Sequence, residues 1–530
     1  MLLWGRVGMS LLKCPQMSWQ KEKWIAGAII LIFLLMITAP YLYAANSSDE
    51  GKVFGGFLLN PIDGNSYLAK MRQGYEGNWM FTLPYTKDPG EGTAINLYYL
   101  FLGHVSRFMS WSLIFTFHLA RVLGAFLLSL VIYRLFRTIF AEANSRLIVF
   151  ALALLGSGLG WAAAAFGLFT SDFWVAEAYP FLASFANAHF PFGLALQIGL
   201  LTPLFGEKSI VWRFGGFTFL VAALLSIVYP FGWVVTVAVT AGWVAWLYWK
   251  RMPWHHELAR WIYMVIGGAP YLFYSSWVVN NHPVLAQWNA QNFTPAPSLV
   301  DLIVSLSPAL LLAVWGMVIV FRRIDSDKTA QYLPIWIITG LLIMYLPLNL
   351  QRRLISGLYI PIAGLSVFAL LILHSARLKR LAVLLLIIFS LPTNLLILAG
   401  EIRAVQDKDP GIYVYTDELA AFDWLEINAA RHSLVIAAPE TGLLVPAYTS
   451  ERVIYGHPFE TVNAEARLNE VRDFYSGGVS TEEASHLLDS EGVDYIFYGP
   501  REKELGTLPA LNNWEIVFEE GEVQIFAPVD

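Results

Sequence analysis

One carboxylate in this chain has the setting of a general base: Asp63, in the segment 60–79. It follows the first long apolar run, so we expect it just beyond a membrane-spanning helix. Pro61 favours the first turn of a helix and Asp63 favours its positive N-terminus, so a short helix is predicted over 64–75. A positioned carboxylate can take the proton of an attacking hydroxyl, which typically contributes about 10²–10⁴-fold to a rate. The alternative interpretation is that Asp63 only caps the helix.

Five other polar residues are candidates for substrate binding. Tyr67 and Glu91 share a long aromatic segment with the candidate base, and this segment is either a substrate-binding loop or a helical lid over the bundle. Asp172, Glu177 and His189 form a second polar cluster, where nearby prolines indicate a loop that dips towards the bundle. This cluster could contact an acceptor or a metal ion. No metal-binding motif is present, so we predict no metal site and no cofactor.

The composition identifies the broad class of protein. Of 530 residues, 57% are hydrophobic and 14% are charged, far from the values of a soluble protein. The mean hydropathy is +0.54, and we therefore expect a polytopic membrane protein. The single cysteine, Cys14, excludes an internal disulfide and a cysteine-based metal site. Neither a Walker motif nor a dinucleotide-binding glycine pattern is present, and we predict no nucleic-acid partner.

The apolar runs predict an α-helical bundle of about eleven spans. Each run is long enough, or nearly long enough, to cross about 30 Å of hydrocarbon. The fourth and fifth runs are short and contain Pro or Gly, so the predicted number of spans carries a margin of two. The runs cover approximately 24–44, 113–134, 147–168, 190–206, 214–229, 231–249, 261–279, 302–321, 333–350, 354–373 and 381–400.

A change in charge near residue 401 predicts a domain boundary. Residues 1–400 carry 26 Lys and Arg against 15 Asp and Glu, whereas residues 401–530 carry 8 against 25. Apolar strands alternate with helical segments after the boundary, and the capping box of Ser480 and Glu483 predicts the start of a short helix. We therefore predict a transmembrane domain over 1–400 and a soluble α/β domain over 401–530.

The basic residues predict the orientation in the membrane. With a cytoplasmic N-terminus, 18 of the first 26 Lys and Arg fall on the inner side, in segments 6–23, 134–146, 208–213, 250–260, 322–328 and 377–380. The first loop (45–112), two further loops (169–189 and 280–301) and the C-terminal domain then lie outside. We predict a multi-pass plasma-membrane protein with an uncleaved first helix; the alternative for residues 1–45 is a cleaved signal peptide.

Arg352 and Arg353 lie on the predicted outer side, against the general bias of the basic residues. Guanidinium groups bind phosphate through two parallel hydrogen bonds, so this pair is a candidate phosphate site. The alternative is an interfacial salt bridge, either to the acidic C-terminal domain or to lipid headgroups. Membrane lipids are an expected partner under both interpretations.

The first outer loop carries an acid, then Tyr67, and then Gly77, Asn78 and Trp79. Together with many spans and an outer C-terminal domain, this pattern resembles the GT-C superfamily of integral-membrane glycosyltransferases. Protein O-mannosyltransferases and aminoarabinose transferases are examples of that superfamily. The resemblance in architecture covers the full chain, whereas the motif covers about thirty residues.

The resemblance implies an inverting glycosyltransferase that uses a polyprenyl-phosphate sugar as donor. It also implies a glycan, lipid or protein acceptor on the outer face, Asp63 as the general base, and a lipid phosphate held by Arg352 and Arg353. Many members carry a pair of acids in the first loop, whereas Gly64 and Asn65 follow Asp63 here. That departure argues against a metal-bound mechanism.

Two other classes of protein fit the sequence. A transporter or lipid flippase would have its polar and broken segments near the membrane midplane, often in repeated halves. Here the polar residues concentrate in the predicted outer loops and no internal repeat is visible. A non-catalytic membrane scaffold whose outer domain binds a partner predicts that Asp63 can be replaced without loss of function.

Overall fold

The computed structural model describes residues 17–203, 211–322, 329–511 and 513–529. The chain divides into two compact units. Unit 1 comprises Met1–Pro40, Leu119–Leu272 and Thr294–Glu401, and unit 2 comprises Tyr41–His118, Phe273–Phe293 and Ile402–Asp530. Several residues of the predicted inner segments lie outside the described ranges: Arg6, Lys13, Lys208, Arg323 and Lys328.

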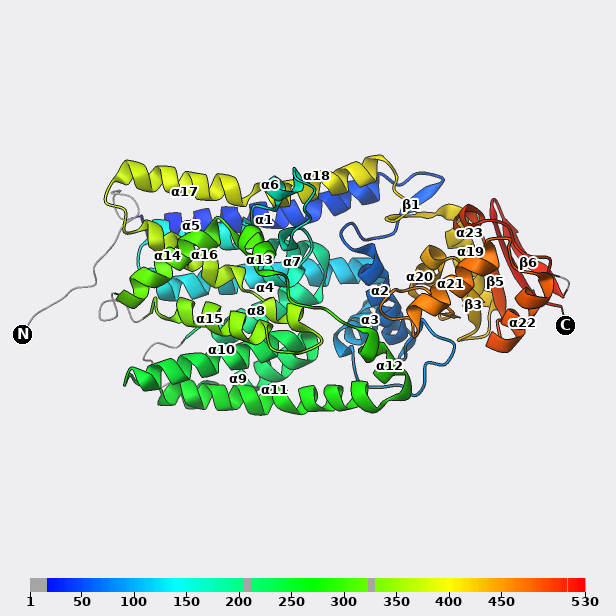
Figure 1. Cartoon of the computed structure of the whole chain (residues 1–530), viewed down its shortest axis with the longest axis horizontal. Helices are drawn as coiled ribbons and strands as arrows, with labels where there is room; N and C mark the ends of the chain where they lie inside the picture. Colours follow the sequence, from blue (N-terminus) through cyan, green and yellow to red (C-terminus); the bar gives the residue numbers. More distant parts are fainter. Residues whose placement is uncertain (1–16, 204–210, 323–328, 512, 530) are drawn as a thin grey trace, which may run out of the picture. The chain divides into compact units, whose positions relative to one another are not determined.

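Unit 1 is helical (Figure 1). Within it, α14 packs along α16 and α10 packs along α15. The helices that lie wholly or mainly in unit 1 are α1 (Trp19–Asn46), α4 (Leu113–Ile139), α5 (Ala143–Leu155), α6 (Gly160–Ala164), η1 (Ser171–Phe173), η2 (Ala176–Ala178), α7 (Pro180–Ala186), α8 (His189–Leu201), α9 (Val211–Val228), α10 (Pro230–Trp249), α11 (His255–Asn281), α13 (Leu299–Leu306), α14 (Ala309–Arg322), α15 (Tyr332–Met344), η3 (Gln351–Ile355), α16 (Tyr359–Leu370), α17 (Ala376–Ser390) and α18 (Pro392–Gln406).

The apolar helices make this a multi-pass membrane protein, as the sequence predicted. Among the described residues, seven helices are long and apolar enough to cross a membrane, and the pair α13 and α14, bent by 92°, would make an eighth. Three shorter apolar helices are α8, α15 and the segment Gly215–Val228 of α9. The number of about eleven spans therefore stays a prediction.

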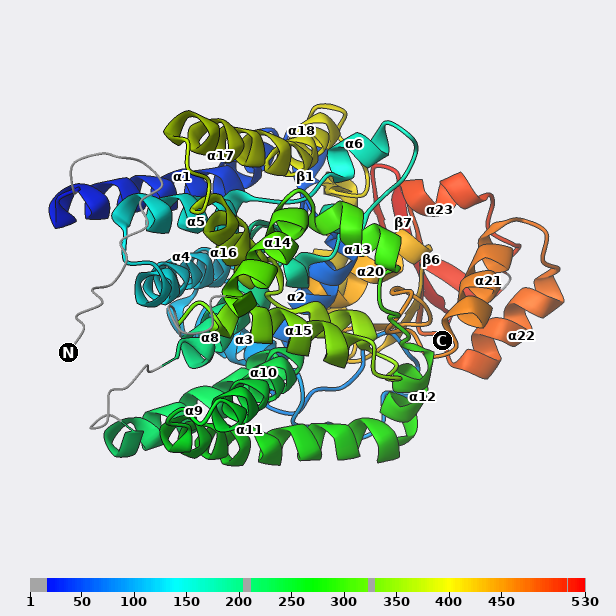
Figure 2. The same ribbon diagram turned by 60° about the vertical axis from the view of Figure 1, so that its left-hand side comes forward.

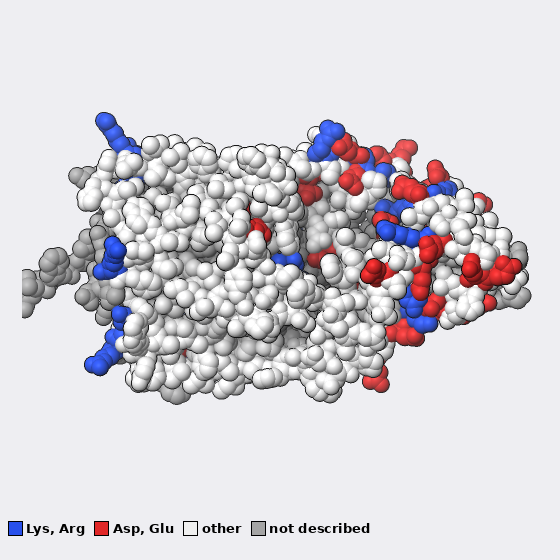
Figure 3. Space-filling model, viewed as in Figure 1, with Lys and Arg blue, Asp and Glu red and all other residues white. Residues whose placement is uncertain are grey.

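On the face shown in Figure 3, basic residues gather at one end of the helical unit. Figure 3 shows unit 1 as largely uncharged along its length, with Lys and Arg gathered at the end where α11 and α17 begin. A buried arginine of α4 links this helix to α1 and α7. Arg121 is fully buried, and its Nη1 donates to the carbonyl oxygens of Ile37 at 2.9 Å and Ser184 at 2.8 Å. A buried cation is costly, and these carbonyl dipoles offset part of that cost.

Unit 2 contains a five-stranded sheet in the order β4-β3-β5-β7-β6 (Figure 2). Strand β3 is parallel to β4 and β5, whereas β7 is antiparallel to β5 and β6. The elements of unit 2 are α2 (Pro61–Glu76), α3 (Leu97–Met109), α12 (Pro283–Gln291), α19 (Thr416–Asn428), α20 (Pro439–Tyr448), α21 (Ala464–Tyr475), α22 (Thr481–Glu491), α23 (Pro500–Leu505), β1 (Lys52–Phe54), β2 (Tyr413–Tyr415), β3 (Leu434–Ile436), β4 (Arg452–Val453), β5 (Tyr495–Tyr498), β6 (Trp514–Glu520) and β7 (Val523–Pro528).

Successive side chains of a strand point to opposite faces of the sheet, and here both faces are apolar. Helices therefore cover both faces. Val435 and Phe497 pack in one cluster with α19 and α20. Leu434 and Ile496 point to the opposite face and pack with α21 and α22. The predicted C-terminal α/β architecture is confirmed, and β6 and β7 form an antiparallel pair at the edge of the sheet. The predicted capping box at the start of α22 is also present.

A second, smaller pairing was not predicted. Strand β1, in the first loop (45–112), pairs antiparallel with β2, which follows residue 401, and Val53 lies opposite Val414. The loop and the C-terminal region therefore belong to one folded unit. Within the loop, α2 crosses α3 so closely that a Cβ on Gly74 would lie 2.1 Å from the carbonyl oxygen of Leu100. Only glycine permits this approach.

Candidate functional site

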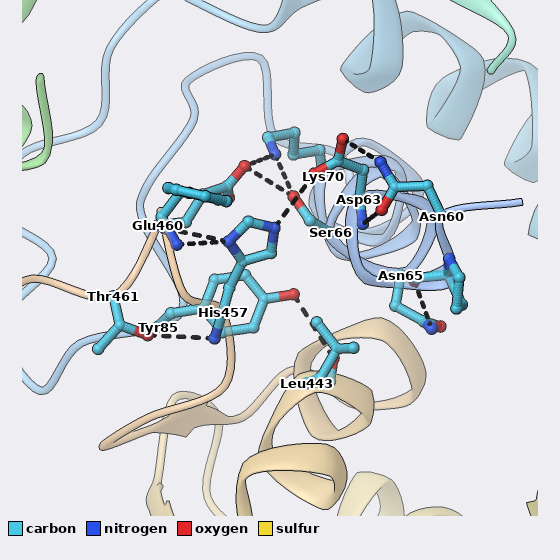
Figure 4. Close-up of polar contacts among 12 residues, drawn as sticks. Asn60, Asp63, Asn65, Ser66, Lys70, Tyr85, Leu443, His457, Glu460 and Thr461 are labelled. Atoms are coloured by element: carbon cyan, nitrogen blue, oxygen red, sulfur yellow. Dashed lines mark hydrogen bonds and ion pairs between the residues drawn. The ribbon is translucent and has the colours of Figure 1, made fainter. Parts of the chain in front are cut away.

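Asp63 lies in the first turn of α2, which begins at Pro61, three residues earlier than predicted. The N-cap is Asn60, in the left-handed conformation, and its Oδ1 accepts from the backbone N–H of Asp63 at 3.3 Å. The Asn60 Nδ2 donates to Oδ2 of Asp63 at 2.6 Å (Figure 4). Asp63 is therefore not the capping residue, and its side chain remains 32% exposed.

His457, which follows β4, lies beside the other oxygen of this carboxylate. Its Nε2 is 3.4 Å from Oδ1 of Asp63, and its ring is 2% exposed. Its Nδ1 accepts from the backbone N–H groups of Phe459 and Glu460, both at 3.1 Å. An Nδ1 that accepts two hydrogen bonds carries no proton, so the proton of the neutral ring is on Nε2. Nε2 itself makes no hydrogen bond of good geometry to the described residues.

Glu460 anchors the same turn to α2. Its Oε1 accepts from Lys70 Nζ at 2.7 Å and from Ser66 Oγ at 2.8 Å. Burial raises the pKa of Glu460, but Lys70, His457 and the hydrogen bond from Ser66 together outweigh burial and hold the pKa below its ordinary value. Asp63, Ser66 and Lys70 are spaced three and four residues apart, which places them along one face of the helix.

Aromatic rings pack around Asp63, His457 and Glu460. The ring of Tyr85 is fully buried, 5.8 Å from the ring of His457. Burial first, and then the negative charges of Glu460 and Asp63, raise the pKa of Tyr85 well above its ordinary value. Tyr67 stacks on Tyr99 at 4.3 Å, so this predicted substrate residue takes part in the packing of α2 against α3.

The arrangement of these groups is suited to accepting a proton. A partly exposed carboxylate, fixed on one side by an amide and facing an imidazole N–H on the other, keeps lone pairs for an incoming hydroxyl. Among the described residues, no group of three or more His, Cys, Asp or Glu could hold a metal ion.

Two residues that the sequence singled out separately meet in unit 1. Arg353 Nη1 donates to Oε1 of Glu177 at 2.5 Å, and Glu177 is almost fully buried. The arginine thus has an ion-pair partner within the helical unit. Arg352 lies next to it in η3, with its guanidinium 4.6 Å from the ring centroid of Trp174.

The remaining predicted residues are placed as follows. Asp172 is fully buried and accepts from the backbone N–H groups of Gly158 and Gly160 and from two threonine hydroxyls, which favours a structural role. His189 begins α8 and packs against Phe190 at 4.2 Å. Glu91 is exposed in unit 2, and its backbone oxygen lies 2.9 Å from Nε2 of His282.

Comparison with solved structures identifies the fold. The oligosaccharyltransferase of Archaeoglobus fulgidus, tethered to an acceptor peptide, matches with a TM-score of 0.57 and 12% identity over 91% of this chain and 70% of that chain. AglB from the same organism, in complex with an inhibitory peptide and a dolichol-phosphate, matches with a TM-score of 0.56 and 12% identity over the same shares. The arabinofuranosyltransferase AftD from Mycobacteria matches with a TM-score of 0.53 and 15% identity, over 98% of this chain and 40% of that chain.

This chain has the GT-C fold. The neighbours are membrane glycosyltransferases, so the superfamily resemblance seen in the sequence is confirmed at the level of fold. No protein-family model and no curated protein sequence matches the chain.

Sequence reasoning missed His457 and Glu460 in this GT-C chain. Both lie in an irregular turn after β4, and neither belongs to a motif with recognisable spacing. The only local hint was the pattern of His457, followed by Pro458 and, three residues after the histidine, by Glu460. The surrounding domain is strongly acidic, so this pattern did not stand out. Nothing in the sequence around Lys70 indicated its partner.

A cavity of about 320 Å³ opens in unit 2 beside α2 and is lined by Arg72, Glu76 and Glu451, among others. Burial first, and then the charges of Glu426 and Glu76, raise the pKa of Glu451 to about 7. Its Oε2 is buried, with no hydrogen-bond partner among the described residues. In the unfolded chain this carboxyl ionises near pH 4.5, so the folded state binds more protons between pH 4.5 and 7, and stability falls as pH rises through that window.

We therefore expect Glu451→Gln to stabilise the protein at pH 8 but not at pH 5. The advantage at pH 8 should be on the order of 1–3 kcal/mol, since one pKa unit corresponds to 1.36 kcal/mol. Thermal unfolding of the detergent-solubilised parent and variant at both pH values measures this difference in stability. Glu465→Gln, at an exposed position on α21, is the control. An equal effect of Glu451→Gln at both pH values would contradict the expectation.

Proposed function

We propose that this chain is a membrane glycosyltransferase that moves a sugar from a polyprenyl-phosphate donor to an acceptor on the outer face of the membrane. The observation that carries the proposal is the match of the fold over 91% of the chain to an oligosaccharyltransferase solved with a dolichol-phosphate. The placement of Asp63 supports it, since a partly exposed carboxylate at the start of α2 suits a base.

The reaction follows from these groups. The acceptor hydroxyl loses its proton to Asp63 while its oxygen forms a bond to the anomeric carbon. The bond from that carbon to the phosphate oxygen breaks, and its electron pair leaves with the polyprenyl phosphate. Attack on the side opposite the leaving group inverts the configuration. Arg352 and Arg353 are the proposed cations for the lipid phosphate.

A transfer assay tests the proposal. The purified protein in lipid nanodiscs is given a panel of short-chain polyprenyl phosphates, each carrying one radiolabelled pentose or hexose, together with the lipid, glycan and protein fractions of a cell envelope as acceptors. We expect release of polyprenyl phosphate and labelled product with at least one donor. Movement of intact donor across a proteoliposome membrane, without cleavage in any combination, would support the transporter interpretation instead.

We also propose that the N-terminus is cytoplasmic and that the C-terminal region is outside. In a Cys14→Ser background, an impermeant thiol reagent applied to intact cells should label Asp88→Cys and Asn469→Cys, whereas His255→Cys and Arg380→Cys should need permeabilised cells. All four positions are exposed within their own units. The reason is the inner location of 18 of the first 26 basic residues. Labelling of the second pair in intact cells would reverse the orientation.

A further inference from the structure

We infer that His457 is the positioning residue of Asp63: its Nε2–H lies 3.4 Å from Oδ1, a weak polar contact rather than a formed hydrogen bond, and attracts the carboxylate into the orientation that accepts a proton. This inference rests on the proposed function, because it concerns the base of that reaction. His457 belongs to the region that follows β4, far along the chain from α2, and the structure places the two groups 3.4 Å apart. Figure 4 shows the imidazole pointing at the start of α2.

The tautomer of His457 is set by its own turn. Two backbone N–H groups, at Phe459 and Glu460, point at Nδ1, and protonating Nδ1 would leave both without an acceptor inside a buried turn. The ring therefore presents a donor to the carboxylate, and that donor carries no full charge. A neutral donor orients the carboxylate without forming an ion pair that would compete with the acceptor hydroxyl.

The turn is itself clamped to the helix that carries the base. Glu460 supplies one of the amides on Nδ1, and its carboxylate is held by Ser66 and Lys70 of α2. The contacts thus form a closed path from Asp63 to His457, through the turn to Glu460, and back to α2 (Figure 4). A closed path of this kind fixes the imidazole relative to the carboxylate, since neither end of the turn can shift alone. On the far side, Asn60 holds the other carboxylate oxygen.

Two substitutions separate positioning from support of the turn. His457→Asn keeps an acceptor near the place of Nδ1 for the two backbone amides but removes the donor that faces Asp63. His457→Gln reaches further and keeps an amide N–H near the place of Nε2, but it loses the acceptor for the turn. A positioning role predicts that His457→Asn has the lower kcat. A purely structural role predicts that His457→Gln has the lower kcat.

The measurement is kcat and donor KM for both variants and for His486→Asn, an exposed histidine of α22 that serves as the matched control. We expect His457→Asn to lower kcat by about 10–100-fold with donor KM within about twofold of the parent, because a misplacement of about 1 Å can cost about 100-fold in rate. His457→Gln should retain more kcat than His457→Asn, and His486→Asn should match the parent.

Three results would overturn the inference. They are a parent-like kcat in His457→Asn, equal losses in both His457 variants, or a loss confined to donor KM, which would place His457 against the donor. Thermal unfolding of each variant shows whether a loss of activity follows a loss of fold. A parent protein with no transfer activity would instead refute the proposed function, so the two failures are distinct.

Discussion

Asp63→Asn abolishes most glycosyl transfer while leaving the fold and donor binding intact; we expect a fall in kcat of about 10²–10⁴-fold, the usual contribution of a general base. The amide is nearly the same size as the carboxylate but cannot take a proton. The cap of α2 should survive, because Asn60 rather than Asp63 is its N-cap. The measurement is labelled product formed at saturating donor, with thermal unfolding as the check on the fold.

The matched control is Asp88→Asn, which removes an exposed carboxylate from the same loop, 45–112. It should turn over at the parent rate. If Asp63→Asn also kept its turnover within a few-fold of the parent, Asp63 would be a structural residue, and the base would have to be sought elsewhere. Donor binding is followed separately, by displacement of a fluorescent polyprenyl phosphate, to distinguish a lost base from a lost site.

Arg352→Lys should weaken donor binding or turnover by about 10–150-fold, which corresponds to about 1.5–3 kcal/mol for a lost charge-assisted contact. Lysine keeps the charge but not the planar fork that pairs with phosphate. It would also lose much of the stacking on Trp174, which lies 4.6 Å from the guanidinium. The assay is donor titration of Arg352→Lys and Arg352→Ala. Arg107→Lys and Arg107→Ala, at an exposed arginine of α3, are the controls. Equal and small effects at both positions would mean that the phosphate is held elsewhere.

Arg353 differs from its neighbour because it pairs with the buried Glu177. Arg353→Ala leaves that carboxylate without its counter-ion, so we expect it to lower the free energy of unfolding by about 3 kcal/mol, the lower end for breaking a buried pair. The double variant Arg353→Ala with Glu177→Gln should recover much of this loss. If it recovers stability but not donor binding, Arg353 serves both the ion pair and the phosphate.

Local sequence patterns were enough to predict the class of fold. Long apolar runs in a chain with 14% charged residues predicted a helical membrane protein, because hydrocarbon excludes charge and unsatisfied backbone. Short apolar segments predicted strands after residue 401, and the spacing of Ser480 and Glu483 predicted the start of α22. These features depend on neighbours a few residues apart, so they can be read without knowing the path of the chain.

The sequence by itself also determined that Asp63 stands at the start of a helix beyond the first span, but only the tertiary structure decided what surrounds it. Ser66 and Glu460 are 394 residues apart and Glu177 and Arg353 are 176 residues apart, yet each pair is joined directly. His457 was unremarkable in its own segment, because a histidine acquires its tautomer and its partner from groups that the fold brings to it. No local pattern carries that information, since the free energy of such contacts depends on burial and geometry that exist only once the units have folded.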